Sequence, residues 1–404
     1  MSDRKAIHDE FDAVVDFFPP AAQPEMAYGL VKLTYQRGER GWRRAKAEPL
    51  FHDMRSPDTT PRWAPGSDFW PTKEQTDVAV RGSAFGPGGK AVSSTRIRVT
   101  VGRQVKTINV FGDRAVTWTP GGKVLFEAPQ PFTEMPVVWE RAYGGYDPRV
   151  PLDLDPMTVA DMGRIEFDHP GLYPRNPLGR GYVVVDEPAQ GVLLPNLEDA
   201  SQPLTPETFV TRDPKLWYRQ PLPACFDFTN AMMFHRLCWL GAEAWFHPPE
   251  GADLPEVRLG MLPPDYHALK GLLVAAPQVV QEGAYGLTFD ALPAETPIIV
   301  EGMHPELPRL GFELPAPPPL ELLIDGKTYP APVQLTNVLV EPAHARVCLT
   351  YVIRQTELPR VFIPGIHANI PLALRVERGH VVRYDCPPTL REQRLAAAAK
   401  GART

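Results

Sequence analysis

The sequence predicts a mainly β protein with a large N-terminal domain of sandwich or barrel type, a small C-terminal β domain and few helices. Short runs of alternating apolar and polar residues recur along the chain, separated by clusters of glycine, proline, asparagine and aspartate. Long stretches at helical spacing are scarce. Proline accounts for 48 of the 404 residues, about twice its usual share. Because proline disrupts helix interiors and central strands, this content favours short strands joined by many turns.

The first element predicted is an amphipathic helix over residues 3–18. Ile7, Phe11 and Val15 fall at helical spacing, and acidic residues occupy the positions between them. Pro19 and Pro20 would end this helix. Residues 1–24 are therefore expected to form an N-terminal helical extension.

Strand patterns follow, and they define a large β-rich domain over residues 25–313. Residues 30–35 and 78–80 are short β-rich runs, and residues 95–111 alternate on both sides of Gly102, which predicts a hairpin. The best helix candidate in the middle of the chain is the segment 228–240.

A polyproline stretch at residues 314–319 predicts a stiff linker before the second domain. Residues 320–386 are predicted to form a small β domain, with strands over 320–324, 334–340 and 346–353. In the last of these, Val347, Leu349, Tyr351 and Ile353 share one face. The alanine-rich residues 387–404 are expected to form a tail.

Composition argues against several functional classes. The formal charge of −6, with acidic and basic residues interspersed, gives no basic footprint for a nucleic acid. No apolar run approaches the roughly 20 residues of a membrane span, and the N-terminus lacks the pattern of a signal peptide. The four cysteines are scattered and form no Cys-x-x-Cys pair. These features predict a protein of a reducing cytoplasm.

Three dense clusters between residues 139 and 198 stand out because each combines glycine or proline with a bulky or charged neighbour. Two interpretations remain open: turns that fix loop geometry, with Trp139 and Tyr143 as core anchors, or a loop-built surface that recognises a partner. The candidate residues are Trp139, Glu140, Arg141, Tyr143, Gly144, Gly145, Asn176, Pro177, Gly179, Gly181, Pro195, Asn196 and Glu198.

The same clusters, read in order as WERAYGG, NPLGRG and LPNLE, resemble a family of bacterial proteins catalogued as a domain of unknown function. The upstream runs Thr76–Gly82 and Val110–Arg114 extend the resemblance over most of residues 25–310. Members of that family are encoded beside PAAR-like effectors of the type VI secretion system. The resemblance implies a non-enzymatic adaptor or chaperone that binds the PAAR-like domain of an effector and loads it onto the VgrG spike.

No catalytic, cofactor or metal site is predicted. The acidic segment 147–168 lacks the central glycine and terminal glutamate of an EF-hand. A glycosidase remains an alternative, because Glu140, Glu198 and Asp199 are carboxylates within the clusters. A lectin-like sugar binder on a β scaffold, which would use Trp and Tyr side chains as platforms, is the other alternative.

Overall fold

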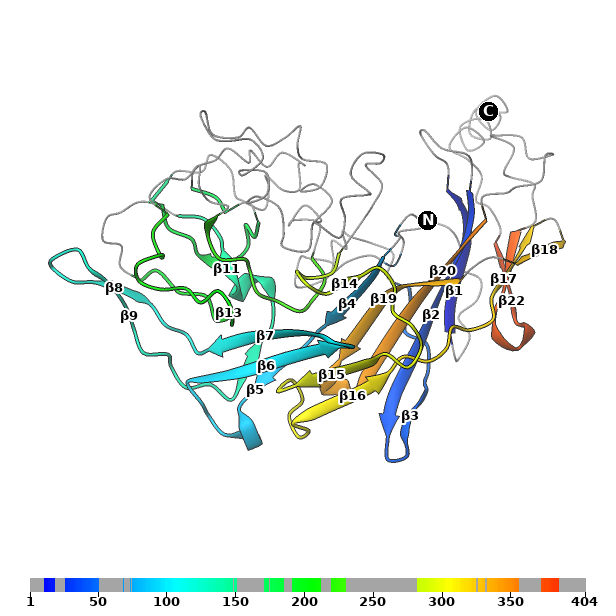
Figure 1. Ribbon diagram of the computed structural model, residues 1–404, viewed down its shortest axis with the longest axis horizontal. Helices are drawn as coiled ribbons and strands as arrows, with labels where there is room; N and C mark the ends of the chain where they lie inside the picture. Colours follow the sequence, from blue (N-terminus) through cyan, green and yellow to red (C-terminus); the bar gives the residue numbers. More distant parts are fainter. Residues whose placement is uncertain are drawn as a thin grey trace, which may run out of the picture.

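Mostly antiparallel β-sheets make up the part of the protein that the structure describes, and strands from both ends of the sequence lie side by side in them (Figure 1). In the described residues, helical structure is limited to three-residue 3-10 turns. The mainly β fold class is therefore confirmed. This computed structural model describes residues 11–18, 26–50, 68, 73, 75–147, 149–150, 171–173, 175–184, 191–211, 219–229, 282–324, 326–330, 333–355 and 372–384.

The largest sheet has the strand order β1-β2-β20-β19-β4-β14, with β3 paired to β2. Neighbouring strands are antiparallel except β19 and β4, which run parallel. We call it the large sheet. Its strands are β1 (Phe11–Phe18), β2 (Met26–Gly38), β3 (Gly41–Arg44), β4 (Thr76–Val80), β14 (Thr288–Phe289), β19 (Val333–Glu341) and β20 (Arg346–Gln355).

Strand β20 confirms the expected burial pattern and explains why the large sheet holds together. Val347, Leu349, Tyr351 and Ile353 are all buried in the main core. Val347 and Ile353 are β-branched and Tyr351 is aromatic, and residues of these kinds suit a pleated, buried surface. Since β20 lies between β2 and β19, it joins the N-terminal strands to the C-terminal ones.

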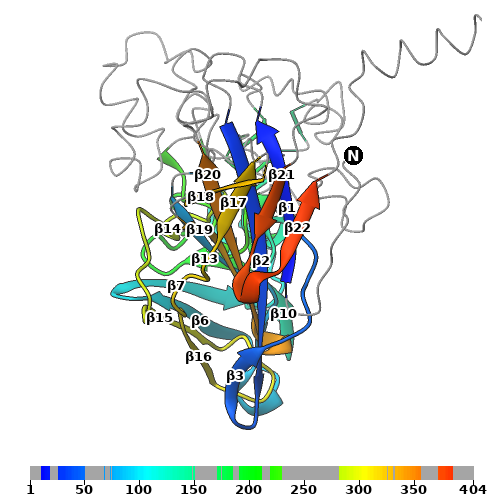
Figure 2. The same cartoon turned by 90° about the vertical axis from the view of Figure 1, so that its right-hand side faces the viewer.

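A second sheet, the crossing sheet, has the order β13-β7-β6-β15-β16. Its strands cross those of the large sheet at a steep angle (Figures 1 and 2). The predicted hairpin is confirmed as β6 and β7, which turn at Gly102 with φ +58°. The strands are β6 (Ser94–Val101), β7 (Gln104–Phe111), β13 (Leu197–Asp199), β15 (Pro297–Glu301) and β16 (Arg309–Glu313).

A smaller C-terminal sheet packs against β1, on the side that faces the viewer in Figure 2. The side chain of Leu374, in this sheet, packs on Gly29 of β2. A Cβ atom added to Gly29 would lie only 2.9 Å from Cδ1 of Leu374. The order is β18-β17-β21-β22. The strands are β17 (Glu321–Ile324), β18 (Lys327–Pro330), β21 (Leu372–Arg375) and β22 (Val381–Tyr384).

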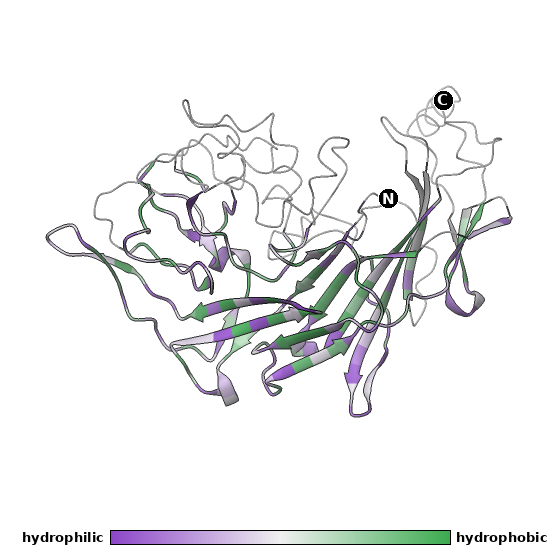
Figure 3. Ribbon diagram, in the orientation of Figure 1, coloured by the Kyte–Doolittle hydropathy of each residue, from purple (hydrophilic) through white to green (hydrophobic). Residues whose placement is uncertain are grey.

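The three sheets share one apolar core. Buried residues of the large sheet, the crossing sheet and the C-terminal sheet form a single cluster, and apolar residues alternate with polar ones along the strands (Figure 3). A second, smaller core contains Tyr143, Tyr173, Tyr182 and Phe209. It packs against a short hairpin formed by β8 (Val116–Trp118) and β9 (Val124–Phe126).

The N-terminal helix prediction is wrong for residues 11–18, which form β1 and pair with β2 along their whole length. Phe11, Ala13 and Val15 are buried on one face, so the period is two and not that of a helix. Without β1, this edge of β2 would have no neighbouring strand. The backbone hydrogen bonds that residues 11–18 make with β2 therefore favour a strand over a helix. Residues 3–10 and 230–240, including most of the second predicted helix, lie outside the described residues.

Strands from the two sides of the predicted linker at 314–319 pair with each other through backbone hydrogen bonds, so the linker does not divide the chain into two separate β domains. Strands β19 and β20, from the predicted C-terminal domain, pair with β4 and β2 of the N-terminal one. Of the described strands that come from the predicted C-terminal domain, only β17, β18, β21 and β22 form a sheet without N-terminal strands. The strands predicted over 334–340 and 346–353 are confirmed as β19 and β20, which form a hairpin with the 3-10 turn Pro342–His344 in its loop.

Candidate functional site

The three sequence clusters meet in one place, which we call the motif junction: residues 139–145, 176–181 and 194–198. Trp139–Arg141 forms the 3-10 turn η2, and the next strand, β11 (Tyr143–Gly144), pairs in parallel with β12 (Arg180–Gly181). A parallel bridge joins Ala142 to Leu197, which opens β13. Segments far apart in sequence are thus in direct backbone contact (Figure 1).

Glycine is required where the chain segments of the junction touch. Gly144 has φ +144°, and a Cβ there would lie 2.2 Å from the carbonyl oxygen of Asn176. Gly181 has φ +93°, and its Cβ would lie 2.8 Å from Cδ of Pro195. Larger residues would push the segments apart, because such contacts are far inside van der Waals distance.

Backbone bonds complete the packing around the same turn. Gly145 and Gly179 each donate their N–H to the carbonyl oxygen of Asn176, at 2.8 and 3.2 Å. Pro177, which has no N–H, is buried in the turn between Asn176 and Gly179. These backbone contacts therefore hold the loops of the junction against one another.

Two buried asparagines fasten the three segments together. Asn176 Nδ2 donates to the carbonyl oxygens of Trp139 and Tyr143, at 2.8 and 3.1 Å. Asn196 Nδ2 donates to the carbonyl oxygen of Phe111 at 3.1 Å, while its Oδ1 accepts from Arg141 Nη1 at 3.0 Å. Side-chain amides suit this role because each offers both donors and an acceptor.

The aromatic residues of the first cluster are anchors. Trp139 is 4% exposed, and its Nε1 donates to the carbonyl oxygen of Phe228 at 2.8 Å. Tyr143 is buried against Tyr173 and Tyr182, with ring centroids 5.2 and 6.4 Å away. Burial raises the pKa of Tyr143 well above its ordinary value. Neither ring is available to stack on a sugar.

The carboxylate of Glu198 lies inside the junction and is paired. Its Oε1 contacts Nη2 of Arg114, and its Oε2 accepts the N–H of Leu204 at 3.1 Å. Burial raises the pKa of Glu198, and the Arg114 guanidinium opposes that shift. Arg114 in turn stacks on Phe111, with Cζ 3.9 Å from the ring centroid. Glu198 is thus committed to an internal ion pair.

The remaining charged residues form the rim of the junction. Glu140 is half-buried, and its backbone oxygen accepts from Arg180 Nε at 3.1 Å. Arg141 and Arg180 both approach Asp113, which is exposed. Arg180 and Asp113 were not among the residues predicted from the sequence. Arg180 lies inside the NPLGRG run and Asp113 inside the Val110–Arg114 run. Their positions within these motifs were the sequence feature that could have identified them as site residues.

A second polar arrangement, unforeseen in the sequence, crosses the large sheet on the face opposite the main core. Cross-strand pairing aligns one polar residue from each of six strands in a single row. We call it the polar row: Asp12, Lys32, Thr350, Asn337, Asp77 and Thr288. The next row, on the core face, is apolar, with Leu33, Leu349, Val338 and Val78 in register.

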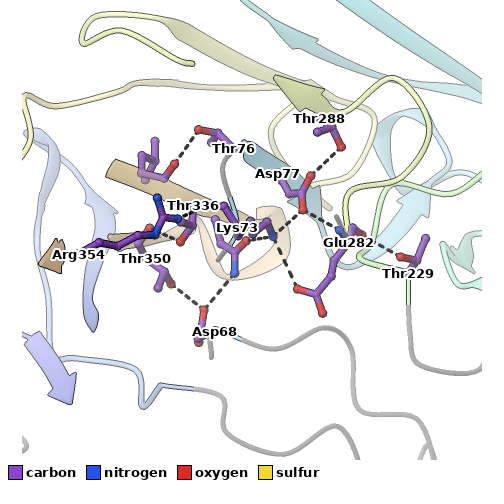
Figure 4. Close-up of polar contacts among 12 residues, drawn as sticks. Asp68, Lys73, Thr76, Asp77, Thr229, Glu282, Thr288, Thr336, Thr350 and Arg354 are labelled. Carbon is purple, nitrogen blue, oxygen red and sulfur yellow. Dashed lines mark hydrogen bonds and ion pairs between the residues drawn. The ribbon is translucent and has the colours of Figure 1, made fainter. Parts of the chain in front are cut away.

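Charged residues from outside these strands pair with the polar row (Figure 4). Lys73 Nζ lies 2.5 Å from Asp77 Oδ2 and 3.7 Å from Glu282 Oε2. Asp77 also accepts from Thr288 Oγ1 at 2.6 Å and from the N–H of Glu282 at 2.7 Å. Lys73 is 1% exposed and Asp77 is fully buried, so each charge depends on these partners.

Asp68 completes the arrangement at the other end of the row. Its Oδ2 lies 2.8 Å from Lys32 Nζ, and its Oδ1 accepts from Thr350 Oγ1 at 2.7 Å. Burial lowers the pKa of Lys32, but the carboxylate of Asp68 more than offsets this, and the pKa is raised overall. With Lys32 and Asp77 buried and paired with opposite charges, the polar row has the features of a structural network and not those of an accessible site.

The acidic segment 147–168 is described only at its beginning. Asp147, its first acid, binds the Arg149 guanidinium through both carboxylate oxygens at 2.8 Å, and residues 151–168 lie outside the described part. Among the described residues, no group of three histidine, cysteine, aspartate or glutamate side chains could hold a metal ion. The same part of the chain contains no helix with the length and apolar character needed to span a bilayer.

Comparison with known proteins places the chain in a family. Searches of curated proteins and of solved structures give no match. A family model described as "Uncharacterized protein conserved in bacteria (DUF2169)" matches residues 22–352. That span includes the motif junction and five of the six residues of the polar row, all except Asp12. Because the match covers most of the sequence, the chain belongs to the bacterial DUF2169 family.

Proposed function

We propose that this protein is a non-enzymatic adaptor, or chaperone, that binds the PAAR-like domain of a type VI secretion effector and helps to load it onto the VgrG spike. One observation carries the proposal: four of the five motif segments on which the resemblance rests, all except Thr76–Gly82, converge on the junction. The Val110–Arg114 run contributes Arg114 and Asp113 to it, beside the three later clusters. Such a rigid, loop-built surface suits recognition of one protein partner.

The sugar-active alternatives receive less support from the same geometry. A glycosidase needs two carboxylates that face a cleft, but Glu198 is buried and paired with Arg114. A lectin-like site needs exposed aromatic platforms, whereas Trp139 and Tyr143 are buried. Glu198, Trp139 and Tyr143 therefore support the structure of the junction, and the more exposed charged residues at its rim are better placed to bind a partner.

Co-expression with the effector encoded next to this gene tests the proposal. The two proteins should co-elute in size-exclusion chromatography, because an interface that recognises one cognate partner should bury about 1,200–2,000 Å². The effector should keep its intact mass, since no chemical change is proposed. A PAAR-like effector from an unrelated gene neighbourhood is the matched control and should elute separately.

Gene deletion gives the corresponding test in the cell, where we propose that the protein acts in the cytoplasm before secretion. Loss of the gene should reduce secretion of the neighbouring effector and leave secretion of other spike components intact. Separate elution of the two proteins, together with normal effector level and secretion in the deletion strain, would show that the proposed function is wrong.

A further inference from the structure

The rim of the motif junction contains two arginines that converge on one oxygen atom. Arg141 ends η2 and Arg180 begins β12, and the N–H of Arg180 donates to the carbonyl oxygen of Ala142 at 3.0 Å. Nη1 of Arg141 and Nη1 of Arg180 lie 3.4 and 3.7 Å from Oδ1 of Asp113. The packed glycines below hold both backbones in place, so this convergence is built into the junction.

Much of the hydrogen-bonding capacity of the two guanidinium groups is unused. Each group carries five N–H donors. Arg141 uses Nη1, which donates to Asn196 Oδ1 and, at 3.4 Å, to Asp113. Arg180 uses Nε, which donates to the backbone of Glu140. Within the described part of the chain, Nε and Nη2 of Arg141 and Nη2 of Arg180 have no acceptor.

Other arginines of this chain show what a closed internal pair looks like. Arg81 binds Asp227 through two parallel bonds, at 2.9 and 3.1 Å. Arg149 binds Asp147 in the same bidentate way. Asp113, by contrast, is 52% exposed and lies at longer distances from its two arginines, while its Oδ1 accepts a hydrogen bond from Asn196 Nδ2 at 3.0 Å. It orients the guanidinium groups without saturating either of them.

The partial burial of two neighbouring guanidinium groups favours an additional anion. Arg141 and Arg180 are 27% and 25% exposed, so water solvates them only in part. Burial lowers the pKa of Arg180, the nearby Arg141 lowers it further, and Asp113 and Glu140 oppose the shift. An incoming carboxylate would relieve the repulsion between the two cations and fill their free donors, which match its planar geometry.

We propose that Arg141 and Arg180 together bind the carboxylate of an acidic side chain on a partner protein. The inference deepens the proposed function, on which it rests for the identity of that partner: an acidic residue on the PAAR-like domain of the effector. A carboxylate is the chosen ligand because the chain's own Asp113 carboxylate already lies between both guanidinium groups.

A titration without the effector tests the site itself. With [15N]arginine-labelled protein, NMR resonances of Arg141 and Arg180, assigned through R141K and R180K, should shift saturably on addition of a tetraglutamate peptide. Tetraglutamine should leave them unchanged, and Arg96 and Arg98 on the exposed face of β6 are internal controls. Absence of a shift, equal shifts at Arg96 and Arg98, or a stronger response to inorganic phosphate at equal ionic strength would overturn the carboxylate site.

Variants test the site in the complex with the effector. R141Q/R180Q should raise the Kd for the cognate effector by about 10- to 100-fold, the range expected for lost charge-assisted hydrogen bonds, while R96Q/R98Q should bind like wild type. R141K/R180K keeps both charges and much of the packing, and should still weaken binding because the planar forks are lost. Melting temperatures identify any variant that fails to fold.

The outcomes separate this inference from the proposed function. If wild type binds the effector and both arginine variants bind equally well, the carboxylate site is wrong and the adaptor function stands. If wild type does not bind the effector, the adaptor function is wrong, and the peptide titration alone decides whether the arginines bind a carboxylate.

Discussion

Trp139 shows how one residue of the motif junction contributes to stability. Its ring is buried in the main core, Nε1 donates to Phe228, and its carbonyl oxygen accepts from Asn176. Replacement by alanine would remove the ring and leave the Phe228 carbonyl without this donor. The residue therefore links the core to the junction, although the sequence left open whether it was an anchor or part of a recognition surface.

Trp139→Ala should lower the melting temperature by several degrees, because truncation of a buried aromatic residue costs about 3–5 kcal/mol. Differential scanning calorimetry measures the change. Glu140→Ala, at the half-buried neighbouring position, should change it little and serves as the control. An unchanged melting temperature for Trp139→Ala, combined with loss of partner binding, would favour the recognition surface.

Two buried cysteines give a second residue-scale prediction. Burial raises the pKa of the Cys225 thiol to about 12 and that of Cys348 to about 11. An unfolded thiol has a pKa of about 8.5, so at pH 8 the folded protein should react with iodoacetamide roughly 100-fold more slowly at these sites or slower still. Peptide mass spectrometry before and after unfolding measures the rates, and equal rates would contradict the prediction.

The same thiols predict how stability depends on pH. Above about pH 8.5 the unfolded chain releases thiol protons that the folded protein retains, so the free energy of unfolding should fall as pH rises from there toward 11. Urea unfolding at pH 8 and pH 10 measures the effect. Cys225→Ala should reduce this dependence, and a free energy of unfolding that rises over the same interval would contradict it.

At the scale of elements, the polar row sets the register of the large sheet. A slip of one residue between two strands would place a polar side chain of the row against the apolar core, because neighbouring residues face opposite sides. Strand β4 shows the consequence: all of Thr76–Val80 is buried, yet Asp77 meets Lys73 while Val78 meets the core. Specific partners on both faces therefore fix β4 next to β19.

Lys73→Met should lower the free energy of unfolding by about 3–5 kcal/mol, because it leaves the buried Asp77 and Glu282 carboxylates without their cation. Chemical denaturation measures the loss. Lys90→Met, at an exposed lysine, should change stability by less than about 0.5 kcal/mol. Adding Glu282→Gln to Lys73→Met should recover part of the loss, and strictly additive effects would show that these charges are not coupled.

At the scale of the whole molecule, the two ends of the chain are needed for one sheet. Strand β20 lies between β2 and β19, and β19 lies next to β4. A chain that ends at residue 313 would lack both strands and the C-terminal sheet. The β2 and β4 edges and the core face beneath them would then be open to water.

We therefore expect the 1–313 chain to show no cooperative unfolding transition and to lose its near-UV circular dichroism. A chain that lacks only the predicted tail, residues 387–404, is the control and should unfold cooperatively. If the 1–313 chain keeps a native near-UV spectrum and a cooperative transition, its residues form an independent domain after all.

The sequence by itself determined the fold class and many strands, because alternation and turn residues act over a few neighbouring positions. The β6–β7 hairpin, β19 and β20 all lie where the pattern predicts them. The sequence also identified the three clusters and Trp139 as unusual, because glycine beside bulky residues indicates places where backbone segments come into close contact. Family membership likewise followed from the order of these motifs.

Only the tertiary structure decided which distant segments meet. Phe11–Phe18 satisfies a helical pattern almost as well as a strand pattern, and the open edge of β2 settled the choice. The polar row draws one residue from each of six strands, and Arg141 and Arg180 converge through loops separated by nearly forty residues. Register and loop packing depend on contacts that no local window of sequence contains, so the charges that each polar side chain meets became visible only in the folded protein.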